Sequence, residues 1–130
     1  MVIDTSAIVA ILRGEPDAAR LRIALAADRR RLISTVSVLE ATCVLTSRHG
    51  SGALLDLNMF LAEFGIEQVP FEVGHLVAAQ RAWLSYGKGQ NPAGLNFGDC
   101  AAYGLALVLG EPSLYIGTDF SRTDVVNAAP

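Results

Sequence analysis

The chain has few of the residues that build zinc sites or disulfide networks. Only two cysteines and two histidines occur among its 130 residues. Cys43 and Cys100 lack the spacing of a metal-binding or redox pair, so we expect two free, buried thiols. His49 and His75 have no cysteine or histidine at ligand spacing, and we expect ordinary surface or helix-end positions for both. Zinc and disulfide chemistry are therefore disfavoured.

Long apolar runs are also missing. No run approaches the ~18 residues that a membrane-spanning helix needs, although 52% of the residues are hydrophobic and the mean hydropathy is +0.39. No basic segment leads into an apolar one at "MVID", so no secretory signal is visible and we expect a cytoplasmic protein. The length predicts a single domain over residues 1–130. The apolar surplus predicts a protein partner or self-association.

Positive charge is scarce, and lysine is nearly absent. The net charge is −3, which argues against a general nucleic-acid coat protein. Apart from Lys88, every basic side chain is an arginine, a residue that suits bidentate phosphate contacts but is also common on solvated helix faces. The run "DRRR" at 28–31 is typical of such a face or of a turn.

Short β-like runs alternate with longer helical runs. The predicted strands cover 1–4, 31–34, 66–70, 113–117 and 124–128. The predicted helices cover 6–12, with Thr5 or Ser6 as the N-cap, then 18–27, 37–50, 52–65 and 72–87, and a last helix starts near Asp99 in "GLNFGDCAAYGLAL" after a loop at 88–94. This order predicts an α/β fold with a mostly parallel sheet covered on both faces. Ligands bind outside the carboxyl ends of such strands.

Four acidic residues stand beside apolar residues at structurally sensitive positions. Asp4 closes the first predicted strand, and Asp119 follows "YIG" at the end of a later one. Asp99 begins a helix, and Glu40 lies inside the apolar helix "SVLEATCVL". Each has a plain structural explanation as well. The aspartates would cap a helix or complement its dipole, and Glu40 would point to solvent.

Taken together, the four acids favour a metal site. Several carboxylates that converge on one sheet edge would repel each other and raise each other's pKa values unless a cation neutralised them. Ligand sets made only of oxygen suit Mg²⁺ or Mn²⁺. Such a centre can activate water and stabilise the charge of a phosphodiester transition state.

Longer motifs connect these acids to a known family. The segments "VIDTSAIVAIL", "SVLEA", "YGKGQNPAGLNFGDCAAYGLA" and "YIGTDFSRTDV" occur in this order along nearly the whole chain. They resemble the PIN-domain ribonuclease toxins of the VapC type, from type II toxin–antitoxin systems. The resemblance implies a three-layer α/β/α sandwich with a mostly parallel central sheet. It also implies an endoribonuclease that depends on Mg²⁺ or Mn²⁺, is inhibited by a cognate VapB-type antitoxin encoded beside it, and forms a homodimer.

The resemblance also assigns roles to individual residues. Asp4, Glu40, Asp99 and Asp119 match the family's acidic quartet, which is both catalytic and metal-binding, and Asp4 and Asp99 are the firmest ligands. Ser6 in "DTS" matches a small hydroxyl residue near that site. The chain departs from the pattern at three positions, since relatives often have a basic residue at Ile116, Asp or Asn at Thr118, and His at Asn91.

The expected substrate contacts lie around this quartet. We expect Ser6, Arg81, Lys88 and Thr118 to bind substrate, and Tyr86 to stack on an unpaired base. A solvated helix end with a buried aromatic ring is the alternative explanation of 81–88. Asp124 is interpreted as a turn or strand-start residue. The apolar faces of 6–12, 18–27 and 37–64 are the expected antitoxin surface.

The predicted reaction is hydrolysis of an RNA phosphodiester bond that leaves a 5′-phosphate and a 3′-hydroxyl. No Ser–His–Asp or Cys–His set indicates a covalent intermediate. Two alternatives stay open. The first is a catalytically degenerate PIN-like binding module. The second is a phosphatase with Asp4 as nucleophile, although Ser6 stands where such enzymes commonly have a second acid.

Overall fold

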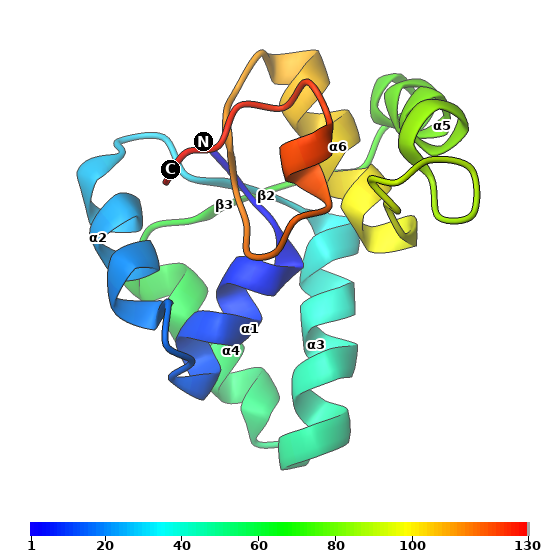
Figure 1. The fold of residues 1–130 in the computed structure, drawn as a ribbon. Coiled ribbons are helices and arrows are strands. Elements are labelled where there is room, and N and C mark those ends of the chain that lie inside the picture. The colour runs from blue at the N-terminus through cyan, green and yellow to red at the C-terminus, as the bar shows by residue number, and fades with distance from the viewer. Residues whose placement is uncertain (130) are drawn as a thin grey trace.

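The computed structural model describes residues 1–129 and contains one parallel sheet of four strands in the order β3-β2-β1-β4. The strands are β1 (Val2–Ile3), β2 (Leu32–Ser34), β3 (Glu67–Val69) and β4 (Ser113–Leu114). The helices are α1 (Thr5–Arg13), α2 (Ala18–Ala27), α3 (Thr35–His49), α4 (Ala53–Glu63), α5 (Val73–Tyr86) and α6 (Phe97–Leu109), followed by the short 3₁₀ helix η1 (Phe120–Arg122). The predicted α/β fold with a parallel sheet is confirmed (Figure 1).

Helices cover both faces of the sheet. Ile3, Ile33 and Leu114 belong to a buried apolar cluster that also contains the inner side chains of α1 to α4. Val2 and Leu32 point to the opposite face, where they pack against Leu105 and Ala106 of α6. Successive side chains along each strand therefore contribute to two apolar cores, one on each face of the sheet. In Figure 1, α5 and α6 lie on one side of the strands and α1, α3 and α4 on the other.

The last predicted strand, 124–128, is wrong. This segment makes one isolated bridge, Ser113 with Asn127, beside β4. β4 itself is shorter than the predicted 113–117, because Leu114 pairs with Ile3, the last residue of β1; beyond it, the Ile116 N–H donates to the Ser6 hydroxyl at 3.1 Å. The carboxyl end of β4 is thereby tied to the start of α1.

The predicted caps of the first helix are also wrong. Asp4, and neither Thr5 nor Ser6, is the N-cap of α1, and its carboxylate accepts the Ser6 N–H. Likewise, α3 begins at Thr35 with Ser34 as its cap, earlier than the predicted start at residue 37. Asp4 is the single residue between β1 and α1, whereas Ser34 is both the last residue of β2 and the cap of α3.

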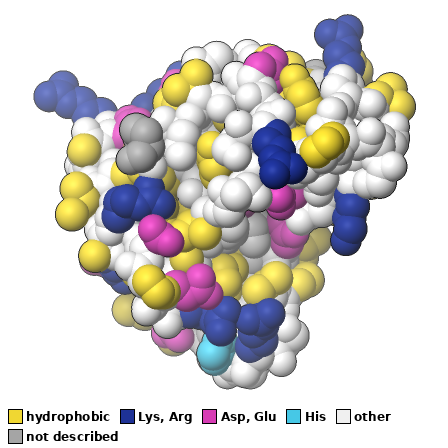
Figure 2. All heavy atoms as spheres, viewed as in Figure 1, with side chains coloured by type: hydrophobic (Ala, Val, Ile, Leu, Met, Phe, Trp, Pro, Cys, Tyr) yellow, Lys and Arg dark blue, Asp and Glu magenta, His cyan; other side chains and the backbone are white. Residues whose placement is uncertain are grey.

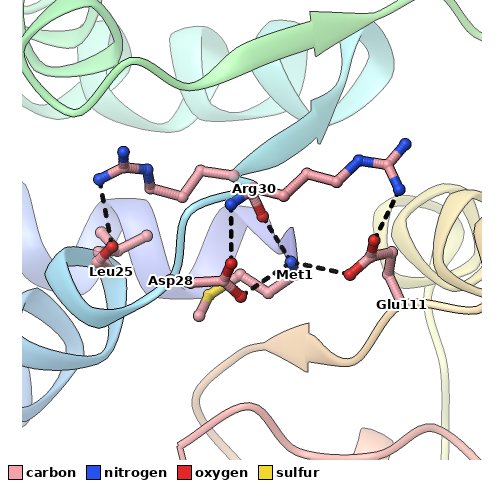
Figure 3. Close-up of polar contacts among 6 residues, drawn as sticks. Met1, Leu25, Asp28, Arg30 and Glu111 are labelled. Carbon is pink, nitrogen blue, oxygen red and sulfur yellow. Dashed lines mark hydrogen bonds and ion pairs between the residues drawn. The ribbon is translucent and has the colours of Figure 1, made fainter.

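The start of β1 is anchored by charge (Figure 3). The ammonium group of Met1 donates to Asp28 Oδ2 at 3.1 Å, to Glu111 Oε2 at 3.0 Å and to the carbonyl of Arg30 at 2.6 Å. The Arg30 N–H and the ammonium group hold the pKa of Asp28 below its usual value, and the ammonium group and Arg30 side chain do the same for Glu111. The "DRRR" segment is thus a turn whose backbone helps to fix the central strand.

Two minor predictions need correction. Cys43 is exposed on α3, because its position lies on the solvent side of that helix, whereas Cys100 is buried as expected. His75 is near a helix end but is 6% exposed, since its Nδ1 accepts the N–H of Glu72 and completes the cap of α5. None of the helices in residues 1–129 is long and apolar enough to cross a membrane.

Candidate active site

Asp4 is the most buried carboxylate at the carboxyl edge of the sheet. Its side chain follows β1 and the residue is 2% exposed. Its Oδ2 accepts the Ser6 N–H at 2.9 Å and the Ser6 hydroxyl at 2.6 Å. Its Oδ1 is buried and has no hydrogen-bond partner among the described residues. Burial raises the pKa of Asp4 although the Ser6 hydrogen bonds oppose this, and the nearby charge of Glu40 raises it further.

Asp99 meets the same edge from the first turn of α6. A reciprocal cap with Asn96 orients it: the Asn96 N–H donates to Asp99 Oδ2 at 2.8 Å, and the Asp99 N–H donates to Asn96 Oδ1 at 3.0 Å. Burial raises the pKa of Asp99 to about 7, against the Asn96 hydrogen bond, and the charges of Asp4, Asp119 and Glu40 add to the rise. The capping explanation of Asp99 is therefore correct but incomplete.

Glu40 does not simply point to solvent from α3. The Thr5 hydroxyl donates to Glu40 Oε2 at 2.6 Å, and the residue is half-buried. A Cβ built on Gly98 would overlap both oxygens of this carboxylate, so Glu40 lies directly against the first turn of α6. The solvent explanation of Glu40 is wrong, because the carboxylate is held between α1 and α6.

Asp119 lies near the other acids but is exposed. It does not end a strand, as the sequence suggested, because β4 stops at Leu114; instead it immediately precedes η1. Phe120 anchors this segment, since its ring is buried and packs on Tyr115 with 4.9 Å between the ring centroids. The backbone on each side of Asp119 is thus tied to the core while its carboxylate faces solvent.

The four acids do not form a preassembled ligand cage. Within residues 1–129, no group of three or more Asp, Glu, His or Cys side chains is arranged to hold a metal ion. The carboxylates are instead close enough for the other three to raise the pKa of Asp99. The structure therefore brings the four predicted acids into one region, but it does not arrange three of them around a common centre.

Ser6 connects two parts of this region. Its hydroxyl donates to Asp4 and accepts the N–H of Ile116, so it links the Asp4 carboxylate to the segment that leads to Asp119. Thr118, another predicted substrate contact, is exposed, and its carbonyl accepts the Ser121 hydroxyl at 2.6 Å. The side chain of Ser6 is therefore engaged within the protein, whereas Thr118 faces solvent.

The loop at 88–94 returns the chain to the start of α6. The Lys88 N–H donates to the Leu95 carbonyl, and the Leu95 N–H donates to the Tyr86 carbonyl, both at 2.9 Å. Arg122 Nη1 donates to the Pro92 carbonyl at 2.7 Å, which ties this loop to the segment that contains Asp119. The backbone of Lys88 is thus bonded to Leu95, just before the cap of α6.

The predicted basic contacts are available to a ligand. Arg81 and Lys88 are exposed, and neither forms an ion pair with another described residue. Tyr86 is half-buried and packs on Tyr103, which supports the alternative explanation of this aromatic ring. Figure 2 shows acidic side chains near the middle of the viewed face with Lys and Arg side chains beside them.

Asp124 has a structural role. The Tyr103 hydroxyl donates to Asp124 Oδ1 at 2.8 Å, and burial together with this bond raises the pKa of the phenol. Asp124 itself lies in a bend and does not start a strand. Sequence reasoning missed other residues of the site, and each stands next to a motif acid or in the same motif: Thr5, Asn96, Gly98 and Arg122.

These features define an α/β domain with a cluster of carboxylates at the carboxyl edge of a parallel sheet. The PIN domain family model matches residues 1–126, and the chain belongs to this family. "Ribonuclease VapC30" of Mycobacterium tuberculosis is 45% identical over 129 residues, which cover 99% of this chain and 98% of that protein. "Ribonuclease VapC" of Mycolicibacterium smegmatis is 46% identical over 125 residues, which cover 96% and 97%.

Solved structures share the fold at low sequence identity. The crystal structure of Mycobacterium tuberculosis VapC20, described as a sarcin-ricin loop cleaving toxin, superposes with a TM-score of 0.80 at 15% identity, over 99% of this chain and 98% of that one. A toxin–antitoxin complex from Klebsiella pneumoniae gives a TM-score of 0.72 at 16% identity, over 98% and 96%. These likenesses establish the shared fold.

The pKa of Asp99 predicts an unusual pH dependence of stability in buffers that contain a chelator. The folded-state pKa of about 7 lies above the ordinary value of 3.8 that the unfolded chain has. Asp99 therefore favours the folded state fully below pH 3.8, and this contribution is lost as the pH rises to about 7. Between pH 4 and pH 7 we expect the loss to be on the order of 3 kcal/mol.

Chemical denaturation of the wild type and of Asp99→Asn measures this contribution. The variant should lose less free energy of unfolding than the wild type over the same pH interval, because its amide does not titrate. Asp56→Asn, which removes an exposed carboxylate on α4, is the matched control and should follow the wild type. Parallel pH profiles for the wild type and Asp99→Asn would contradict the assignment.

Proposed function

We propose that this protein is a metal-dependent endoribonuclease and the toxin of a toxin–antitoxin pair. The observation that carries the proposal is the buried Asp4–Asp99 pair at the carboxyl edge of the sheet, with Glu40 and Asp119 beside it, in a chain that belongs to the PIN domain family. Relatives of almost the same length are named ribonucleases, which supports RNA as the substrate. They give no support to the binding-module or phosphatase alternatives.

The donor set fits a hard divalent cation. Asp4 Oδ1 is buried without a partner among the described residues, and burial raises the pKa values of Asp4 and Asp99, with a smaller rise from the neighbouring carboxylates. Carboxylate oxygens are the ligands that Mg²⁺ and Mn²⁺ prefer. Asp4 and Asp99 would hold the ion, and Glu40 and Asp119 would complete its surroundings or hold a second one. When bound, the metal would activate water and stabilise charge on the phosphate.

The chain's own residues supply orientation. Ser6 and Asn96 hold the Asp4 and Asp99 carboxylates at the sheet edge, so these groups are in place before substrate arrives. Arg81 and Lys88 would contact phosphates of the RNA on either side of the cleaved bond. The contacts of Ser6 and Thr118 with substrate stay predictions, and Arg122 is a further candidate because it joins the 88–94 loop to the Asp119 segment.

The antitoxin would bind along the helices that the apolar pattern predicts. A groove of about 630 Å³ is lined by residues of α1 to α4, including Leu12, Arg22, His49, Met59 and Glu63. Its mixture of apolar and charged side chains suits an amphipathic helix that also has charged residues. The Klebsiella pneumoniae structure is a toxin–antitoxin complex, which supports a partner of this class.

We also propose a homodimer, since large apolar side chains such as Val73, Leu84 and Phe97 are exposed.

Replacing either buried aspartate by asparagine tests the catalytic proposal. Asp4→Asn and Asp99→Asn preserve side-chain shape and keep one acceptor oxygen, but they remove the charge that would hold the metal. We expect RNA cleavage in Mn²⁺ to fall at least ~100-fold while the folded structure is retained. Cleavage is measured on defined RNA oligonucleotides, with circular dichroism as the check on folding. Wild-type cleavage rates in either variant would refute the proposal.

Lys88→Ala tests the proposed phosphate contact. RNA affinity should fall for all sequences tested, and the slope of log affinity against log salt should decrease by about 0.7, because one phosphate contact on a single strand is lost. Arg48→Ala is the matched control, since Arg48 is exposed at the opposite end of α3 from the cap Ser34. An unchanged salt slope for Lys88→Ala would remove Lys88 from the RNA surface.

The assembly proposal is tested by light scattering on size-exclusion columns. The purified protein should elute with the mass of a dimer and form a larger, stoichiometric complex with the product of the adjacent gene. That complex should also lose ribonuclease activity. A protein that elutes as a monomer and does not bind the product of the adjacent gene would contradict both the proposed homodimer and the proposed antitoxin complex.

A further inference from the structure

Glu40 reaches the acidic region from within a helix. The three aspartates of the region, Asp4, Asp99 and Asp119, lie at a strand end, in a first helical turn and in a loop, where the backbone itself places them. Glu40 lies within α3 and depends on side-chain contacts for its position. The contact with Thr5 is direct: its hydroxyl donates to Glu40 Oε2 at 2.6 Å, and Thr5 itself is 7% exposed.

Gly98 lies on the other side of the same carboxylate. A Cβ at this position would overlap Oε1, Oε2 and Cδ of Glu40, so the carboxylate occupies the space that any larger residue would need. Gly98 does not have a positive φ, so backbone conformation does not require glycine here. Glycine within a helix costs about 1 kcal/mol relative to alanine. The absence of a side chain at position 98 therefore has a reason in the contact with Glu40.

Two other helical glycines, Gly104 and Gly74, have different surroundings from Gly98. A Cβ on Gly104 would lie 2.6 Å from the backbone carbonyl of His75, so this glycine allows α6 to pack closely on α5. A Cβ on Gly74 would meet nothing within 4 Å. At Gly98 the obstacle is the end of a flexible acidic side chain. The helix could therefore tolerate alanine, provided that the Glu40 carboxylate moved.

We propose that Thr5 and Gly98 are positioning residues, which together hold the Glu40 carboxylate against the first turn of α6 beside Asp4 and Asp99. Thr5 fixes the carboxylate by a hydrogen bond, and Gly98 leaves the volume that it fills. The consequence for RNA cleavage depends on the proposed function, whereas the packing of Glu40 against Gly98 does not. A metal ion held by this region would contact the Glu40 carboxylate only while the Thr5 hydrogen bond and the packing against Gly98 are both intact.

The first experiment measures Mn²⁺ affinity by electron paramagnetic resonance and cleavage of an RNA oligonucleotide. Gly98→Ala should weaken Mn²⁺ binding and cleavage about tenfold, because the added methyl group displaces the Glu40 carboxylate. Glu40→Asp shortens the side chain and leaves room for that methyl group. Adding Gly98→Ala to Glu40→Asp should therefore change Mn²⁺ affinity less than twofold. Equal losses in both backgrounds would overturn the assignment of Gly98.

Thr5 is tested with a pair of conservative variants. Thr5→Val keeps the shape and removes the hydroxyl, and Thr5→Ser keeps the hydroxyl. Mn²⁺ affinity should fall about tenfold in the first variant and less than twofold in the second. A role of Thr5 in packing alone predicts the opposite order, since Val fills the site better than Ser, and that order would overturn the assignment of Thr5.

A stability cycle without metal or RNA separates this inference from the proposed function. In chelator, Gly98→Ala should raise the melting temperature in a Glu40→Ala background, where only helix propensity acts. In the wild-type background the gain should be smaller by about 3 °C, because the Thr5–Glu40 contact is lost. Gly74→Ala should give the same change in both backgrounds, and Gly104→Ala should destabilise both.

The outcomes can be told apart. Coupling between positions 98 and 40 in a protein that cleaves no RNA would refute the proposed function and leave the positioning contact intact. Equal gains from Gly98→Ala in both backgrounds, in a protein that Asp4→Asn inactivates, would refute the positioning contact alone.

Discussion

The carboxylates at the carboxyl edge of the sheet are the constraint on which the rest of the site depends. Asp4 is nearly inaccessible, and Asp99 is buried in the first turn of α6. Removing an ionised carboxylate from water costs free energy unless charges or hydrogen bonds compensate. The negative charge of Glu40 also raises the pKa values of Asp4 and Asp99. A protein that keeps such a pair has placed destabilising charge in one location, which is typical of functional sites.

The neighbouring residues limit this cost and fix the geometry. Ser6 donates twice to Asp4, and Asn96 donates its backbone N–H to Asp99. Thr5 donates to Glu40. None of these donors is a basic side chain, so hydrogen bonds orient the carboxylates without neutralising them. The negative charge of the region is therefore not cancelled by these contacts, and the basic side chains of Arg81 and Lys88 are exposed on the surface.

The same contacts join the segments of the fold. Ser6 links α1 to the segment after β4, and Glu40 lies between Thr5 of α1 and Gly98 of α6. Arg122 connects the loop before α6 to η1. The polar contacts that orient the carboxylates thus also connect the segments that follow the carboxyl ends of the strands. The same few hydrogen bonds orient the carboxylates and connect α1, α6 and the segment after β4.

Several features were predictable from local pattern alone. The alternation of short apolar runs and helical segments predicts the parallel sheet, because consecutive parallel strands need helical crossovers. Asp4 and Asp99 were identifiable since a strand end and a helix start place them without help from other segments. The motifs around all four acids were enough for the family, which the match over residues 1–126 confirms.

Tertiary contacts decided the rest. Periodicity alone left Glu40 free to face solvent; only the approach of α1 and α6 shows that its carboxylate is held between Thr5 and Gly98. The segment 124–128 has an apolar, strand-like pattern, yet it forms only one isolated bridge to β4, between Ser113 and Asn127. A sequence records the preferences of neighbouring residues. Which distant oxygen a hydroxyl meets, and which glycine leaves room for it, depends on how the elements pack.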